Sequence, residues 1–463
     1  MQKAIQRDIF RAYDIRGKVN EDFFPPDAYA IGLVIGSKLL AMKRHQILIG
    51  RDGRLSSPEI KQHLLIGLLD SGCDVIDLGL TPTPIAYFAT LQLSVPDAVI
   101  VTASHNPGHY NGIKMVIGNA PLTEKEIRQI YDSIFENRYQ PAEQRGTHSL
   151  YSDILDDYST AVISDIKLAK PLNIAIDCGN GVTSILAESL FTSIGCVVTP
   201  LFCELDGHFP NHSPDPTDPD NLLALQQLVI EQNLDLGIAF DGDGDRVIAV
   251  NGQGKILWPD RIMMLLAQSI LADFPASTVV CDVKCSDLLG HTVKASGGEV
   301  ELCPTGHSHL KRVVKETNAM LGGEFSGHII LRDRWSDFDD GLYAAARLLE
   351  ALSLHDEKCD VVFAQLPENS STPEYRLPFP TPTTAKSALD HLIHTADFKD
   401  GNLSFIDGLR VDFNYGWGLM RTSNTSPDIT VRFEASSVEQ LESIKAQFRV
   451  LLRNAGINNE LPF

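Results

Sequence analysis

Residues 102–107, with the sequence TASHNP, place a serine hydroxyl beside a histidine at the end of an apolar run. The run itself, residues 98–101, is short and continuously apolar, which predicts a buried strand. The Asn-Pro pair that closes the segment predicts a sharp turn. Ser104 is therefore a candidate nucleophile or phosphoryl carrier. An ordinary loop serine is the alternative, and this segment alone does not exclude it.

A second segment, DGDGDR, alternates carboxylates with glycines. Asp241, Asp243 and Asp245 can turn towards one centre because glycine permits tight turns, and carboxylates so close together repel one another unless a cation lies between them. Oxygen ligands favour magnesium or calcium over zinc or copper. An EF-hand is excluded, because the sixth and twelfth positions are not the glycine and glutamate that its loop requires. A solvated acidic turn is the alternative, whereas Arg246 would suit an anionic substrate beside a metal.

Two further segments combine groups that recognise sugars and phosphates. GGEFSGH offers Glu324 and Ser326 as hydrogen-bond partners for sugar hydroxyls, and His328 to bind phosphate or move a proton. RTSNTSP begins with Arg421, and its hydroxyls, amide and backbone N–H groups would make a phosphate cradle. Each residue taken alone is more often structural, so the density of functional types is the signal.

Composition limits the class of protein. The 463 residues carry 39 Lys and Arg against 60 Asp and Glu, a net charge of −21, and 43% are hydrophobic. Such an acidic chain argues against nucleic-acid and anionic-membrane partners. The eight dispersed cysteines indicate neither a disulfide framework nor a zinc site and suit a reducing cytoplasm. We expect a cytoplasmic protein, because the N-terminal residues lack a signal-peptide core and no apolar run is long enough to cross a membrane.

The chain alternates strand-like and helix-like segments. Continuous apolar runs predict strands covered on both faces, as in the mostly parallel sheets of α/β proteins, at residues 46–50, 173–177, 236–240 and 278–283. Residues 339–352 predict a helix with apolar positions 342, 345, 349 and 352 on one face, and with two aspartates at its positive end. The polar segments repeatedly follow predicted strands, where ligands bind in open α/β sheets.

In this order, the motifs TASHNP, DGDGDR, GEFSGH and RTSNTS resemble the α-D-phosphohexomutase superfamily, and within it the bacterial phosphomannomutase/phosphoglucomutase group. The resemblance runs from residues 13–17 to residues 432–435. It implies an α/β fold with a four-domain, heart-shaped architecture around a central cleft, in which three related α/β domains precede a C-terminal lid domain. The expected domains are 1–149 with the serine segment (TASHNP, 102–107) and 150–253 with the acidic segment (DGDGDR, 241–246). They are followed by 254–366 with the sugar segment (GGEFSGH, 322–328) and 367–463 with the phosphate segment (RTSNTSP, 421–427). A Pro-rich stretch before the last domain is consistent with a moving lid.

The resemblance also implies the roles of individual residues. The expected catalytic residues are Ser104, as a phosphoserine, with Arg16, Lys114 and His328. The expected metal ligands are Ser104, Asp241, Asp243 and Asp245. The expected substrate-binding residues are Tyr13, Arg246, Lys284, Thr305, Gly306, His307, Glu324, Ser326, Arg421, Ser423, Asn424 and Thr425. Either His328 or Lys114 would take and return the hydroxyl proton.

The implied activity is reversible transfer of phosphate between C1 and C6 of mannose and glucose phosphates. It would proceed through the phosphoserine and a 1,6-bisphosphate intermediate. Mg²⁺ is the expected cofactor, glucose 1,6-bisphosphate or mannose 1,6-bisphosphate the activator, and hexose phosphates are the partners of a monomer. The alternatives are a metal-dependent sugar phosphatase, a phosphoglucosamine-type mutase and a non-catalytic sugar-phosphate sensor. The second is disfavoured because the chain has RTSNTSP where that branch has an RxSGTEP-like segment.

Overall fold

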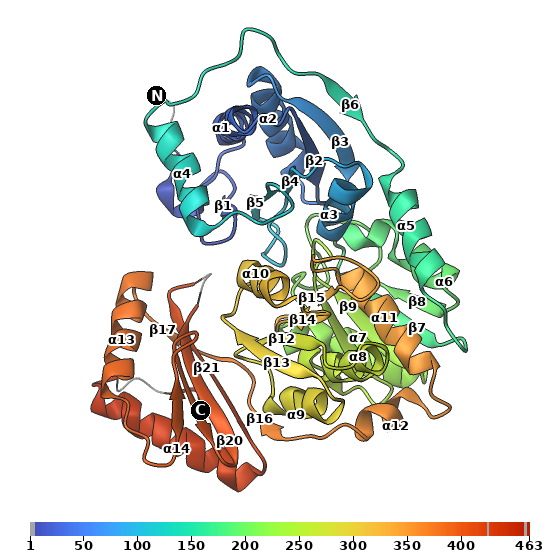
Figure 1. Ribbon diagram of the computed structural model, residues 1–463, viewed down its shortest axis with the longest axis vertical. Helices are drawn as coiled ribbons and strands as arrows, with labels where there is room; N and C mark the ends of the chain where they lie inside the picture. Colours follow the sequence, from blue (N-terminus) through green and yellow to red (C-terminus); the bar gives the residue numbers. More distant parts are fainter. Residues whose placement is uncertain (1–4, 424–425, 458–460) are drawn as a thin grey trace. The chain divides into compact units, whose positions relative to one another are not determined.

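The structure is a computed structural model that describes residues 5–423, 426–457 and 461–463. The chain forms two compact units (Figure 1). Met1–Ile262 and Ser326–Val362 make the first unit, and Met263–Phe325 and Phe363–Phe463 make the second. The predicted sugar segment is therefore divided, with Glu324 in the second unit and Ser326 in the first.

The N-terminal part of the first unit is a six-stranded mixed sheet with helices. Its elements are β1 (Ile15–Lys18), α1 (Asp27–Ala41), β2 (Gln46–Arg51), α2 (Ser57–Asp70), β3 (Asp74–Leu80), α3 (Thr83–Gln92), β4 (Ala98–Val101), β5 (Tyr110–Val116), α4 (Glu124–Phe135) and β6 (His148–Leu150). The strand order is β1-β5-β4-β2-β3-β6. β2 runs parallel to β3 and β4, and β5 runs antiparallel to β1 and β4. α1 and α2 lie side by side (Figure 1) and share one apolar core with α4 and the sheet.

β4 lies inside this sheet, between β2 and β5. All four of its residues are fully buried, which confirms the strand predicted at residues 98–101. On the neighbouring β5, Ile113 and Met115 point into the core shared with α1, α2 and α4. Successive side chains of a strand point to opposite faces, so Lys114 lies on the other face. The fold thus directs a lysine away from the apolar core and places a serine at the end of the adjacent strand.

A second sheet completes the first unit. Its elements are α5 (Ile154–Asp165), β7 (Asn173–Asp177), α6 (Ala187–Ser193), β8 (Val197–Leu201), α7 (Leu223–Glu231), β9 (Leu236–Phe240), β10 (Val247–Asn251) and β11 (Ile256–Leu257). The residues of β15 (Ile329–Leu331) and α11 (Gly341–Ser353) also belong to this unit, but β15 is not a strand of this sheet. The strand order is β11-β10-β9-β7-β8, with β7 parallel to β8 and β9. β7 and β9 have the predicted bounds, because continuous apolar runs suit strands buried on both faces. The chain passes between the units at three points, and the helices α8 (Pro259–Asp273) and α12 (Cys359–Ala364) span two of them.

α11 departs from the single apolar face that the sequence predicts. Its residues are buried almost all round, including Arg347, which forms an ion pair with Asp333 at 2.6 Å. The helix also begins two residues later than predicted. Asp340 precedes it as a cap whose carboxylate accepts a 3.0 Å hydrogen bond from the backbone N–H of Tyr343. Asp340 therefore stabilises the start of α11 through a direct hydrogen bond to its first turn.

The second unit holds a parallel sheet and an antiparallel sheet. The parallel part contains β12 (Thr278–Asp282), α9 (Asp287–Ala295), β13 (Glu299–Cys303), α10 (His307–Thr317) and β14 (Leu321–Gly323), and β12 pairs with both other strands. The antiparallel part contains β16 (Ser370–Ser371), β17 (Tyr375–Pro378), α13 (Pro382–Thr395), β18 (Asn402–Ser404), β19 (Leu409–Phe413), β20 (Gly416–Thr422), β21 (Asp428–Ala435) and α14 (Val438–Asn454). α13 and α14 pack on it around one apolar core. Among the described residues, no helix is long and apolar enough to cross a bilayer.

Candidate active site

The serine segment leaves β4 in a tight, buried turn. Ser104 is 1% exposed and has a backbone φ of +50°, a left-handed conformation that residues other than glycine rarely adopt. Its N–H donates to Thr102 Oγ1 at 2.9 Å, and its hydroxyl donates to Asp241 Oδ2 at 2.8 Å. His105 Nδ1 lies 3.3 Å from the same hydroxyl. A serine hydroxyl carries one proton, and its closer partner is the carboxylate.

The acidic segment follows β9 and brings three buried carboxylates together. Carboxylate oxygens of Asp241, Asp243 and Asp245 lie within 4.8 Å of one another. Burial, followed by the charges of the other two aspartates, raises the pKa of Asp241 well above its usual range. Burial also opposes ionisation of Asp245, but Lys114 and His328 outweigh it and hold the pKa of Asp245 well below its usual range. Gly244 adopts φ +82°, and its N–H donates to Asp241 Oδ1 at 3.0 Å.

This acidic cluster fits a hard divalent cation. The side chain of Asp243 is almost fully buried, and its Oδ1 has no hydrogen-bond partner among the described residues. Its Oδ2 accepts hydrogen bonds from Thr83 at 2.5 Å and from Lys114 at 2.7 Å. An unsatisfied buried carboxylate oxygen is costly without a cation, and an all-oxygen set suits Mg²⁺. The hydroxyl of Ser104 reaches the same cluster through its hydrogen bond to Asp241.

Lys114 bridges two of the carboxylates. Its ammonium group contacts Asp243 and Asp245 and is almost fully buried. Burial lowers the pKa of Lys114, but the charges of Asp243 and Asp245 outweigh it and raise the pKa well above its usual range. Lys114 is therefore held as a cation in this arrangement, so it neutralises the acidic cluster and is poorly suited to accept a proton.

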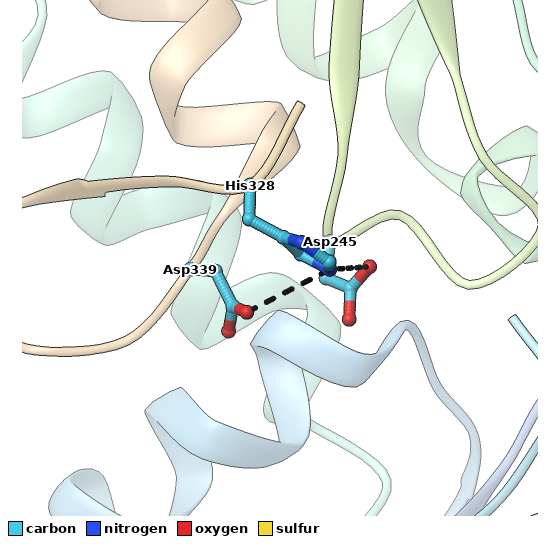
Figure 2. A group of neighbouring side chains, drawn as sticks. All are labelled: Asp245, His328 and Asp339. Carbon is cyan, nitrogen blue, oxygen red and sulfur yellow. Dashed lines mark ion pairs between the residues drawn. The ribbon is translucent and has the colours of Figure 1, made fainter. Parts of the chain in front are cut away.

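His328 lies between groups of opposite charge. Figure 2 shows its imidazole between Asp245 and Asp339, with Nε2 at 3.3 Å from Asp245 Oδ1 and 3.9 Å from Asp339 Oδ2. Arg246 Nε lies 3.2 Å from the same nitrogen, and Ser326 Oγ lies 3.4 Å from Nδ1. The carboxylates favour the imidazolium, whereas the guanidinium favours the neutral ring. Because imidazole can both accept and donate a proton, His328 is a candidate to carry the hydroxyl proton.

Arg16 also reaches the serine segment. It lies on β1, is 6% exposed, forms an ion pair with Asp14 and donates to Asn106 Oδ1 at 2.5 Å. Eight predicted residues therefore meet in the first unit around the carboxylates of the acidic segment or the turn of the serine segment. They are Ser104, Asp241, Asp243, Asp245, Lys114, Arg16, Arg246 and His328. Tyr13 precedes β1 in the same unit and is partly exposed.

The second unit gathers polar groups around Glu324. Glu324 is 1% exposed and accepts a hydrogen bond from the N–H of Gly306. Thr305 donates its hydroxyl to Asp282 Oδ2 and its N–H to Asp407 Oδ2, both at 2.9 Å. His307, the first residue of α10, follows directly. Glu324, Thr305, Gly306 and His307, all predicted to bind substrate, thus belong to one cluster.

Two basic residues of the second unit are each held by a carboxylate. Lys284 Nζ lies 3.2 Å from Glu374 Oε2, and Arg421 Nε donates to Asp407 Oδ2 at 2.7 Å. Burial lowers the pKa of Lys284, but Glu374 and Asp282 outweigh it and raise the pKa. Ser423 follows Arg421 at the end of β20, where its N–H donates to Asp428 O at 2.8 Å. The remaining predicted phosphate-binding residues, Asn424 and Thr425, lie outside the described residues.

Four family models match successive parts of the chain. They are phosphoglucomutase/phosphomannomutase alpha/beta/alpha domain I at residues 7–141, domain II at 155–254, domain III at 258–370 and the C-terminal domain at 376–451. The chain belongs to the phosphoglucomutase/phosphomannomutase family. Membership of this family confirms the four-domain α/β architecture and the mutase class that the motifs predicted.

Relatives of this family match almost the whole chain. A phosphomannomutase/phosphoglucomutase of Pseudomonas putida is 44% identical over 460 residues, which cover 99% of this chain and 98% of that protein. A phosphoglucomutase of Neisseria gonorrhoeae is 42% identical and covers 97% of this chain and 98% of its own length. A crystal structure of a phosphoglucomutase/phosphomannomutase family protein from Burkholderia thailandensis matches with a TM-score of 0.93 at 40% identity, covering 99% of this chain and all of that one.

The prediction from sequence missed three carboxylates that lie beside predicted site residues. Asp339 beside His328, Glu374 beside Lys284, and Asp407 beside Arg421 and Thr305 all touch predicted site residues. Asp339 has a sequence signal, because an aspartate pair before a helix exceeds what one cap requires. Asp407 and Glu374 stand in ordinary polar segments that carry no comparable signal.

Proposed function

We propose that this protein transfers a phosphoryl group between C1 and C6 of mannose and glucose phosphates through phospho-Ser104 and a 1,6-bisphosphate intermediate. The observation that carries the proposal is the 2.8 Å hydrogen bond between Ser104 and Asp241, inside a buried cluster of three carboxylates. A nucleophile beside a cation site is the arrangement that phosphoryl transfer needs.

The transfer step assigns one role to each residue. The bond between phosphorus and Ser104 Oγ breaks as a bond to the free hydroxyl oxygen of the bound sugar phosphate forms, and Ser104 Oγ is left as the alkoxide that accepts the second phosphoryl group. The proton of that hydroxyl passes to Nε2 of His328, and Lys114, held as a cation, offsets negative charge on the transferring group. After the bisphosphate has turned over, its other phosphoryl group returns to Ser104. His328 then returns the proton to the oxygen that this group leaves.

We propose that the cation is Mg²⁺, held by Asp241, Asp243, Asp245 and Ser104. When bound, it would supply charge neutralisation for the transferring phosphoryl group. Support comes from the oxygen-only ligand set and from the unsatisfied Oδ1 of Asp243. Glucose 1,6-bisphosphate or mannose 1,6-bisphosphate would place the first phosphoryl group on Ser104 and so activate the enzyme.

The second unit supplies substrate recognition in this proposal. Glu324, with Ser326 of the first unit, would accept and donate hydrogen bonds to sugar hydroxyls. The phosphate that is not reacting would be bound by Arg421, Ser423, Asn424 and Thr425. The other proposed substrate-binding residues are Lys284, Thr305, Gly306 and His307 of this unit, with Tyr13 and Arg246 of the first unit. The relatives' names include both mannose and glucose phosphates, which supports activity on both sugars.

We further propose that the protein is a cytoplasmic monomer with domains 1–149, 150–253, 254–366 and 367–463. Each range contains most of one sheet, although β11 lies just past the second boundary and still pairs with β10. The free thiols of all eight cysteines are consistent with a reducing compartment.

One assay separates the mutase from its alternatives. The protein is incubated with glucose 1-phosphate, Mg²⁺ and a trace of glucose 1,6-bisphosphate, and the phosphorus NMR spectrum is followed. Glucose 6-phosphate as the product supports the proposal. Release of inorganic phosphate would indicate a sugar phosphatase, and binding without turnover would indicate a sensor; either result overturns the proposal. Comparing kcat/KM for mannose 1-phosphate, glucose 1-phosphate and glucosamine 1-phosphate then defines the sugar specificity.

A further inference from the structure

We propose that Arg54 is the positioning residue of this enzyme's nucleophile, holding Ser104 in its left-handed backbone conformation through hydrogen bonds to the serine segment. The inference rests on the proposed role of Ser104 as phosphoryl carrier. Arg54 belongs to the segment RDGR, which follows β2 in the sequence and has no part in the transfer step. Its side chain is fully buried, and protein groups accept hydrogen bonds from all of its guanidinium N–H groups, so it has no donor left for the sugar.

Every N–H group of the Arg54 guanidinium donates a hydrogen bond. Nη2 donates to the carbonyl oxygens of Ser104 and Asn106, both at 2.6 Å. Nη1 donates to the carbonyl oxygens of Pro107 at 2.8 Å and Tyr110 at 3.2 Å. Nε donates to Asp52 at 3.0 Å. One side chain therefore gathers four carbonyl groups of the turn, and only the planar five-donor fork of arginine does so.

Asp52 fixes the guanidinium and extends its hold to the amide of Ser104. Its carboxylate accepts hydrogen bonds from the hydroxyls of Ser57 at 2.5 Å and Thr102 at 2.8 Å, besides those from Arg54. Thr102 Oγ1 in turn accepts from the N–H of Ser104 at 2.9 Å. The carbonyl of Ser104 is thus held by Arg54, and its N–H is held by Thr102 and Asp52.

The hydrogen bonds to both the carbonyl and the N–H of Ser104 explain how this residue keeps a left-handed backbone. A residue other than glycine stays in that region only where its surroundings over-determine it. The serine hydroxyl must also stay close to Asp241, because a displacement of about 1 Å in a reacting group can cost a factor of about a hundred in rate. Without Arg54, four carbonyls would lose their donor and the turn would relax away from this geometry.

The connection between β8 and α7, which contains Gly207 and Phe209, covers Arg54. The ring of Phe209 lies 5.1 Å from Arg54 Cζ, in a cation–π arrangement. Gly207 approaches the Arg54 backbone so closely that a Cβ there would lie 3.0 Å from Arg54 Cα. Water is therefore excluded from the guanidinium, and its hydrogen bonds to the turn are correspondingly strong.

The test compares Arg54→Lys with the control Arg347→Lys. Arg347 is another buried arginine of the first unit that pairs with a carboxylate, and it is outside the proposed site. Lysine keeps the charge but cannot span the four carbonyls. We expect kcat for glucose 1-phosphate to fall about a hundredfold in Arg54→Lys, with KM changed by less than about threefold. Phosphorylation of Ser104 by glucose 1,6-bisphosphate, followed by intact-protein mass spectrometry, should slow to the same degree. The control should lose thermal stability but keep kcat.

Normal kcat in a folded Arg54→Lys variant would overturn the inference. If Arg54→Lys does not fold, Thr102→Val tests the same hold, because it removes the acceptor of the Ser104 N–H, and kcat must again fall more than KM changes. The two proposals fail differently. If wild-type protein is never phosphorylated on Ser104, the proposed function is contradicted. If phosphorylation proceeds equally well in wild type and Arg54→Lys, only the positioning role of Arg54 is contradicted.

Discussion

Lys114 on β5 donates a 2.7 Å hydrogen bond to Asp243, a residue 129 positions later in the chain that follows a strand of a different sheet. The pair joins the serine-bearing sheet to the acidic segment and leaves the carboxylate cluster partly neutralised without a metal. Lys114 therefore offsets the charge of two of the three carboxylates that a divalent cation would bind.

Replacing Lys114 should make the protein's stability depend on Mg²⁺. In Lys114→Met the buried carboxylates lose their ammonium partner, at a cost of about 3–5 kcal/mol. We expect a lower thermal midpoint in EDTA, and a larger rise on adding Mg²⁺ than wild type shows. Lys61→Met, which breaks a lysine–aspartate pair of the same sheet at Asp77, is the control. It should lose stability equally with and without Mg²⁺. Equal Mg²⁺ shifts in Lys114→Met and wild type would show that Lys114 and the cation do not share this cluster, and the absence of any shift in both proteins would contradict a cation there.

Removing the hydroxyl of Ser104 should abolish turnover. Loss of a covalent nucleophile costs kcat on the order of 10⁴-fold or more, so Ser104→Ala should convert almost no glucose 1-phosphate. Ser94→Ala is a matched control, because Ser94 also has a left-handed backbone, with φ +55°, but lies before β4. Ser94→Ala should retain wild-type kcat. Near-normal turnover in Ser104→Ala would contradict the assignment.

His328 should contribute through proton transfer. A positioned general base is worth about 10²–10⁴ in rate, so His328→Gln should lower kcat by about a hundredfold or more while KM changes little. The control is His208→Gln, which removes an exposed histidine that also pairs with an aspartate, Asp206. If His328→Gln keeps wild-type kcat, the proton must pass to another group.

Asp407 should matter for substrate affinity. It accepts hydrogen bonds from Arg421 and from the N–H of Thr305, so it orients two predicted phosphate-binding groups. In Asp407→Ala the guanidinium loses a charged partner, and we expect KM for glucose 1-phosphate to rise about tenfold with a smaller change in kcat. Asp400→Ala, an exposed carboxylate of the same unit, should leave both constants unchanged. A fall in kcat with unchanged KM would place Asp407 in a different role.

The buried cap Asp340 should make stability fall with rising pH. Burial outweighs the hydrogen bonds from Tyr343, Tyr158 and Trp335 and raises the pKa of Asp340 to about 7. The folded state then binds a proton that the unfolded state has released above about pH 4, so stability declines between about pH 4 and 7, by at most about 1.4 kcal/mol per pH unit.

The measurement is the difference in thermal midpoint between wild type and Asp340→Asn. Asparagine cannot titrate, so the advantage of wild type should shrink from pH 5 to pH 7 and then stay constant. Asp337→Asn, a partly exposed carboxylate in the same segment, should show no such trend. A difference that stays constant between pH 5 and pH 7 would mean that Asp340 is ionised in the folded state throughout this range.

Much of the local structure could be predicted from sequence. The runs at 98–101, 173–177 and 236–240 became strands with those bounds, because continuous apolar segments are stable when covered on both faces. The prediction for α11 was less complete. Its apolar positions were identified, but small residues and a paired Arg347 allowed the whole helix to be buried, which periodicity alone does not reveal.

The chain's sequence by itself determined which residues carry chemistry and where they stand relative to their own strands. Glycine spacing, carboxylate repulsion and turn chemistry are local effects, so the serine and acidic segments could be identified without a fold. Only the tertiary structure decided how Ser104 meets Asp241, how Lys114 meets Asp243, and how Arg54 meets the carbonyls of the serine turn. Those contacts join residues 50 to 137 positions apart. They depend on strand order and on the face to which each side chain points, which a local pattern does not encode.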